Sequence, residues 1–126
     1  MELATTAQNR EIALKVGEWS SIAKEALADN TLRAYKVDGR VYSDYCKAND
    51  LQPIPADPQT VISFIKDEAD KGRAFATIKR RLATISQMHK AAEQDNPADS
   101  ELVKLTIKGL AKRLGTDQAQ APGISL

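Results

Sequence analysis

The residues of this sequence that could do chemistry are mostly cationic, and they gather in one stretch. Between Lys71 and Ala92 there is no acidic residue. Six lysines and arginines fall inside it: Lys71, Arg73, Lys79, Arg80, Arg81 and Lys90. At helical spacing, the face that can pack on a core carries Ile78, Leu82, Ile85 and His89. The opposite face carries Arg73, Ala76, Thr77, Arg80, Thr84 and Gln87.

A helix with one packing face and one cationic face is suited to lie against a polyanion. We therefore interpret this stretch as a DNA-recognition helix. The alternative interpretation is an ordinary core helix with a solvated basic face.

The distribution of charge supports an anionic partner better than its total does. The formal net charge is only +1. Residues 1–70 carry 8 Lys/Arg against 12 Asp/Glu, a net charge of −4, whereas residues 71–126 carry 10 against 5, a net charge of +5. We expect the second half of the chain to meet the anionic partner.

The residues that support catalysis in enzymes are too few or too scattered to predict a reaction centre. Cys46 is the only cysteine and His89 the only histidine; both fall on packing faces, which favours a buried thiol and an interface histidine over catalytic groups. The aspartates are spread over helix surfaces and caps, and none of the common catalytic or nucleotide-binding motifs occurs. We expect a binding module that is not an enzyme, with no cofactor, no metal and no small-molecule substrate.

The length and patterning predict one all-α domain. The 126 residues support one domain with a modest core. Five helices are expected, at about 9–28, 31–49, 58–71, 72–93 and 97–114, in a compact bundle of four to five helices without a sheet. Residues 1–8 are predicted to be disordered, residues 9–115 to form the domain, and residues 116–126 to form a linker.

Several local signals position these helices. Asp29-Asn30-Thr31 offers capping side chains, Asp57-Pro58 marks an N-cap and first helical residue, and Gly115 marks a stop. Gly17 is expected to split or kink the first helix, and Gly39 to permit a close helix crossing. The third helix is predicted to carry an acidic solvent side: Asp67, Glu68 and Asp70. Without a signal peptide or an apolar run of about 20 residues, the predicted compartment is cytoplasmic, with no membrane partner.

Four segments, taken together, resemble a known family. They are DNTLRAYKVDGRVYSDYC (29–46), PADPQTVISFI (55–65), ATIKRRLATISQMH (76–89) and VKLTIKGLAKR (103–113). In order and spacing they are similar to the N-terminal SAM-like core-binding domain of tyrosine recombinases, the phage integrase family, of the Cre-like type. The resemblance covers about residues 9–115.

The resemblance implies one half of a C-shaped clamp that grips a recombination half-site with two helices at the major groove. From the second helix, the residues implied to face double-stranded DNA are Thr31, Arg33, Ala34, Val37 and Arg40. From the fourth helix they are Ala76, Thr77, Lys79, Arg80, Arg81, Thr84 and Gln87. These sets largely match the outward faces obtained from the helical spacing alone.

The resemblance also implies partners and a missing activity. The first and last helices would contact other protomers of the parent recombinase in a synaptic tetramer. The family's catalytic residues lie in a C-terminal domain, so we expect this fragment to have no cleavage activity of its own.

Two other functions stay open. A helical protein–protein interaction module would use the acidic third helix and the apolar stripe of the last helix. A stand-alone helix-turn-helix regulator is less favoured, because a whole helix separates the two candidate DNA helices.

Overall fold

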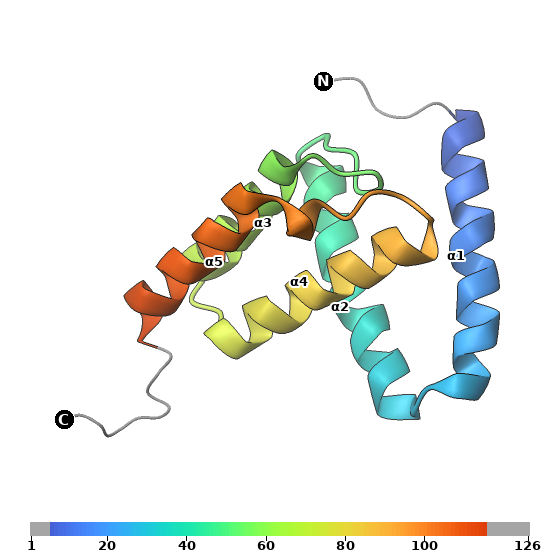
Figure 1. The fold of residues 1–126 in the computed structure, drawn as a ribbon, viewed down its shortest axis with the longest axis horizontal. Helices are drawn as coiled ribbons and strands as arrows, with labels where there is room; N and C mark the ends of the chain where they lie inside the picture. The colour runs from blue at the N-terminus through green and yellow to red at the C-terminus, as the bar shows by residue number, and fades with distance from the viewer. Residues whose placement is uncertain (1–5, 116–126) are drawn as a thin grey trace.

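Five α-helices and one short 3₁₀ turn make up the part of the chain that the computed structural model describes, residues 6–115 (Figure 1). The elements are α1 (Thr6–Ala26), α2 (Asp29–Ala48), α3 (Pro58–Asp70), α4 (Phe75–Ala91), η1 (Pro97–Asp99) and α5 (Glu101–Leu114). This range contains no strand, which confirms the predicted all-α bundle. Within it, no helix combines the length and the hydropathy that a bilayer crossing needs. The predicted linker 116–126 and residues 1–5 lie outside the described residues.

The start of α3 and the end of α5 follow the predicted sequence signals. Asp57 is the N-cap of α3 and Pro58 its first residue, where the missing N–H of proline costs nothing. Gly115 caps α5 with φ of 66° and donates its N–H to the Ala111 carbonyl, a left-handed conformation that glycine adopts without strain.

The beginnings of α1 and α2 differ from the predictions. α1 starts at Thr6, inside the segment expected to be disordered, and continues through Gly17 without a break. α2 starts at Asp29 with Ala28 as N-cap and no side-chain cap. Asp29 therefore sits inside the first turn, where its negative charge is favoured by the helix dipole and not by capping geometry.

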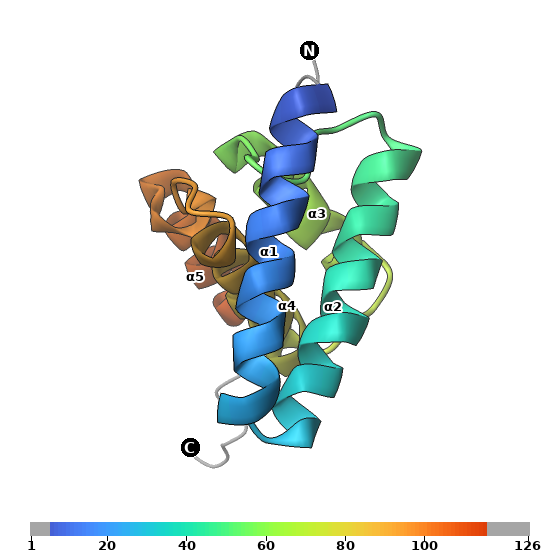
Figure 2. The ribbon, with the colours of Figure 1, turned by 90° about the vertical axis from the view of Figure 1, so that its right-hand side faces the viewer.

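α1 lies at the edge of the bundle, against α2 and α4 (Figure 2). The rings of Trp19 and Tyr35 pack with their centroids 6.0 Å apart at 59°, so the only tryptophan anchors α1 on α2. The outer face of α1 leaves Leu14 and Ile22 each 69% exposed. α1 is thus attached along one side only.

The core gathers around α3. Phe64 is 1% exposed and packs edge-on against Tyr42 and Tyr45, with ring centroids 5.4 and 5.3 Å away. The Tyr42 hydroxyl donates to the Pro53 carbonyl at 2.8 Å, which satisfies its polar end inside the core. Further fully enclosed apolar side chains come from α2, from α3, α4 and α5, and from the residue after α4: Cys46, Val61, Ile65, Ile78, Ile85, Ala92 and Val103.

His89 joins α4 to the connector before α3. Its Nε2 accepts the Ala56 N–H at 3.0 Å, so its Nδ1 carries the proton and donates to the Ile85 carbonyl at 2.8 Å. The ring is completely buried, which confirms the predicted interface histidine. Burial lowers its pKa below the usual value and outweighs the opposing effect of the Ile85 hydrogen bond.

The protein should lose stability as the pH falls below about 6.5, because the unfolded chain then binds a proton that folded His89 resists. His89→Gln, which can keep both hydrogen bonds, should flatten the stability curve between about pH 7 and pH 5. Thermal melts followed by circular dichroism at several pH values measure both. An unchanged slope in His89→Gln would assign the pH dependence to other groups.

Candidate nucleic-acid interface

The predicted site depends on where α2 and α4 cross. These two helices make the most extensive contact of any helix pair between residues 6 and 115, and α4 passes over the middle of α2 (Figure 1). At Gly39, an added Cβ would lie 3.7 Å from the Met88 sulfur, an ordinary contact distance. The crossing therefore does not depend on the missing side chain of Gly39, contrary to the prediction.

A buried carboxylate holds the crossing. Asp38 of α2 is 0% exposed. Arg80 of α4 donates to it through Nε (2.8 Å to Oδ2) and Nη2 (2.9 Å to Oδ1), a bidentate pair. Arg81 adds a third hydrogen bond from Nε to Oδ1 at 3.3 Å.

Arg81 links this carboxylate to a second one. Its Nη1 donates to Oε1 of Glu68 on α3, and Glu68 also lies 3.7 Å from Nε of Arg73. The Glu68 side chain is only 2% exposed and that of Arg81 11% exposed. Three helices are therefore joined by a chain of ion pairs, Asp38–Arg81–Glu68, which lies mostly out of water.

Two predictions about this region are wrong. Glu68 does not belong to the acidic solvent side of α3, and Arg81 does not lie on an outward face. The physical reason is shared: each charge satisfies the other, because a buried ion without a partner is far costlier than a buried pair.

The predicted outward position of Thr84 is also wrong. Thr84 is 2% exposed, and its hydroxyl donates to the Arg80 carbonyl at 3.2 Å while lying 3.4 Å from Oδ2 of Asp38. α2 packs on the part of the α4 cationic face that contains Thr84. The helical spacing identified a polar face correctly but could not show which part of it another helix covers.

The other predicted residues keep accessible positions. On α2, Thr31, Arg33, Val37 and Arg40 are exposed and Ala34 is half-buried. On α4, Ala76, Lys79 and Arg80 are exposed, and Thr77 and Gln87 are half-buried. Arg33 donates to the Asn30 side chain at 3.2 Å, and the Lys79 ammonium lies 5.7 Å from the Phe75 ring centroid.

The exposed cations of the site come from both helices: Arg33 and Arg40 from α2, Lys79 and Arg80 from α4. Arg80 reaches across to Asp38, so its guanidinium contacts α2. Arg33 and Arg40 are four and three residues from Val37, which places them on the same helical face. We refer to the exposed predicted residues Arg33, Val37, Arg40, Ala76, Lys79 and Arg80 together as the α2–α4 flank.

The Asp38–Arg80 ion pair keeps its charges at neutral pH. Burial raises the pKa of Asp38, but the hydrogen bonds and charges of Arg80 and Arg81 outweigh burial and hold that pKa below its usual value. Asp38 in turn raises the pKa of Arg80. Because Asp38 balances part of the Arg80 charge, the positive excess of the flank comes mainly from Arg33, Arg40 and Lys79.

Asp38 is absent from the functional residues predicted from the sequence. A signal was available: Asp38 lies four residues before Tyr42, on the inward side of its helix. A carboxylate at such a position requires a cationic partner, and the unbroken basic stretch of α4 is the obvious source of one.

Comparisons with known proteins identify a matching family and related sequences. The family described as phage integrase, N-terminal SAM-like domain, matches residues 21–96, which contain both helices of the flank. The chain is 34% identical over 118 residues to the integrase/recombinase xerD homolog of Selenomonas ruminantium, covering 91% of this chain and 33% of that protein. It is 25% identical over 89 residues to the recombinase cre of Escherichia phage P1, covering 71% of this chain and 26% of that protein. The chain thus spans a third or less of these relatives.

Arg81→Ala should destabilise the fold by about 3 kcal/mol, because it leaves two buried carboxylates short of a partner. The neighbouring exposed cation provides a matched control: Lys79→Ala should change the free energy of unfolding by less than about 0.5 kcal/mol. Urea denaturation of both variants measures the difference. Equal, small effects would contradict the structural role assigned to Arg81.

Proposed function

This chain belongs to the family of phage integrase N-terminal SAM-like domains, and on that premise we propose that it binds the double-stranded DNA of a recombination half-site through the α2–α4 flank. The observation that carries the proposal is the Arg80–Asp38 pair, because it fixes α4 against α2 while the Arg80 side chain stays 52% exposed at the crossing. Neither helix alone presents more than a few cations. Joined, they form one positively charged surface.

The side chains of the flank suit approach to a groove. Short residues lie between the cations: Thr31 and Ala34 on α2, and Ala76 and Thr77 on α4. Short side chains let a helix backbone come close to the major groove, which is about 12 Å wide, while longer cations reach phosphates on either side. We assign Arg33, Arg40 and Lys79 to the phosphate contacts.

The strand-transfer chemistry is proposed to reside outside this chain. The two relatives are named as recombinases, and this chain spans 33% and 26% of their lengths. Within residues 6–115, the only histidine is engaged on both ring nitrogens inside the bundle. We propose that this chain grips DNA and contributes no residue to strand cleavage.

Binding to a duplex should depend strongly on salt. If the chain neutralises three to four phosphates, the logarithm of its DNA association constant should fall with the logarithm of the salt concentration at a slope of about −3. The affinity should then drop about 60-fold between 50 and 200 mM salt. Arg33→Ala/Lys79→Ala, which removes one cation from each helix, should reduce the steepness to about −1.5. Fluorescence anisotropy of a labelled 20-base-pair duplex measures both slopes.

The control for that titration removes the same charge elsewhere. Lys104→Ala/Lys108→Ala takes two exposed cations from α5 and should leave slope and affinity near the wild-type values. If both double variants weaken binding equally, general attraction and not the flank explains the affinity. Absence of salt-dependent binding by the wild-type chain would contradict the proposed function itself.

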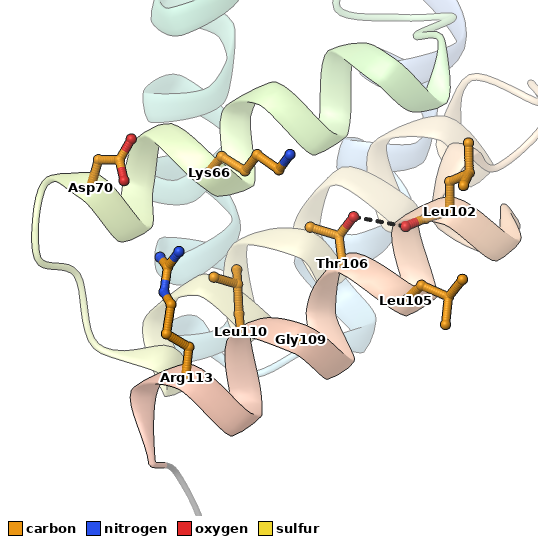
Figure 3. Close-up of a pocket in the computed structure, with 8 residues that line it drawn as sticks. All are labelled: Lys66, Asp70, Leu102, Leu105, Thr106, Gly109, Leu110 and Arg113. Atoms are coloured by element: carbon orange, nitrogen blue, oxygen red, sulfur yellow. Dashed lines mark hydrogen bonds between the residues drawn. The ribbon is translucent and has the colours of Figure 1, made fainter.

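A second surface favours contact with other protomers. Leu102 and Leu105 of α5 are 53% and 52% exposed, and they line a hollow of about 590 Å³ between α5 and α3. Figure 3 shows Lys66 and Asp70 of α3 on its far side, with Arg113 at its end. We propose that the apolar outer face of α1, with Leu14 and Ile22, fills this hollow of a neighbouring protomer in a synaptic tetramer.

Leu102→Lys/Leu105→Lys should abolish association between copies bound to one duplex and leave stability within about 0.5 kcal/mol, because both side chains are already exposed. Sedimentation velocity with a 40-base-pair duplex separates singly from multiply occupied DNA. Glu101→Lys, on the same helix outside the hollow, is the control. Unchanged multiple occupancy in the leucine variant would exclude this surface.

A further inference from the structure

Arg80 differs from the other cations of the α2–α4 flank because a buried acid fixes it. Its Nε and Nη2 are bound to the two Asp38 oxygens at 2.8 and 2.9 Å, and Asp38 is itself completely enclosed. Yet the Arg80 side chain remains 52% exposed. One edge of the guanidinium is therefore held by the fold, while about half of the side chain meets solvent.

The free part of this guanidinium keeps a usable pair of donors. Of its five N–H groups, Asp38 takes the one on Nε and one on Nη2. Among residues 6–115, Arg80 donates to no acceptor besides Asp38. The end edge, formed by Nη1 and the second N–H of Nη2, thus still offers two parallel donors.

The surroundings favour deep insertion of this edge. On its own helix, the neighbours of Arg80 one turn away are short: Ala76, Thr77 and Ala83. No long side chain at these positions of α4 therefore covers the exposed half of the Arg80 side chain. Phosphate contacts position a protein on DNA and base-edge contacts read its sequence, so a long donor with short neighbours is suited to reach a base edge.

We propose that Asp38 is a positioning residue, which holds Arg80 so that its end edge donates to O6 and N7 of a guanine in the major groove. This inference rests on the proposed DNA binding and adds to it the base that is recognised and the residue that orients the contact. An arginine side chain that is mobile in the free protein loses rotamer entropy when it binds DNA. The Arg80 side chain loses less, because Asp38 already orders it in the unbound protein. Specificity for guanine then depends on a residue that touches no DNA.

The opposing interpretation makes Asp38 a structural residue only. It would then set the α2–α4 crossing, and its loss would lower stability and binding to every sequence alike. The two interpretations differ in what happens to base preference. Asp38→Asn removes a negative charge near the phosphates, so under our proposal binding to random DNA should stay equal or become tighter while preference for guanine falls.

The experiment selects bound duplexes from a pool of random sequence and sequences them. The wild-type chain should enrich guanine at one position by about tenfold, as expected for a good bidentate contact. Asp38→Asn and Arg80→Lys should each reduce that enrichment to about twofold or less. The double variant should lose no more than either single one, because the two residues act as one unit. Lys104→Gln, on α5, should keep the wild-type enrichment.

Circular dichroism at the assay temperature checks that each variant is folded. Asp38→Glu is a second variant at this position, since it keeps the charge and changes only the reach of the carboxylate; it too should lose guanine preference. Wild-type enrichment in either folded Asp38 variant overturns the positioning role. If Arg80→Lys weakens all sequences equally, Arg80 contacts phosphate, which overturns the guanine contact. Absence of any DNA binding by the wild-type chain overturns the proposed function and this inference together.

Discussion

The structure depends on the buried acid–base chain Asp38–Arg81–Glu68, with Arg80 and Arg73 at its ends. It joins α2, α3 and α4 at the point where the two candidate DNA helices cross. Apolar packing around Phe64 supplies most of the favourable burial but is not directional. The ion pairs are directional, because each donor must meet its own acceptor. They therefore fix how α2 lies against α4.

Much of the fold could be predicted from the sequence because apolar spacing and terminal signals are local. The faces carrying Tyr42, Ile78 and Ile85 pack inward as their spacing requires, and Pro58 and Gly115 mark helix ends by their backbone restrictions. The errors at Arg81, Glu68 and Thr84 have a different origin. A helical wheel treats each helix alone and assigns charged residues to water, whereas here the partner of an arginine lies 42 or 43 residues away. Only the tertiary arrangement shows that these polar groups satisfy one another.

These corrections change the candidate site without removing it. Arg81 and Thr84 serve the crossing, so the accessible charge comes from fewer residues than the basic stretch suggests. The residues that remain in the candidate site are well ordered. Arg80 is held by two hydrogen bonds to Asp38, and its neighbours belong to the two helices that this carboxylate joins. A surface that is rigid before binding loses less conformational entropy when its partner arrives. The edges of the bundle, α1 and the outer side of α5, keep exposed leucines and isoleucine away from this flank.

The central claim is that two non-adjacent helices form one DNA-binding surface. Its most direct test is a titration of the ¹⁵N-labelled chain with a 16-base-pair duplex at low salt, followed by backbone amide shifts. The account predicts that the largest shifts fall together on α2 around residues 31–40 and on α4 around residues 76–83, with α5 unaffected. Shifts confined to one of these two helices, or centred on α3 or α5, would contradict it.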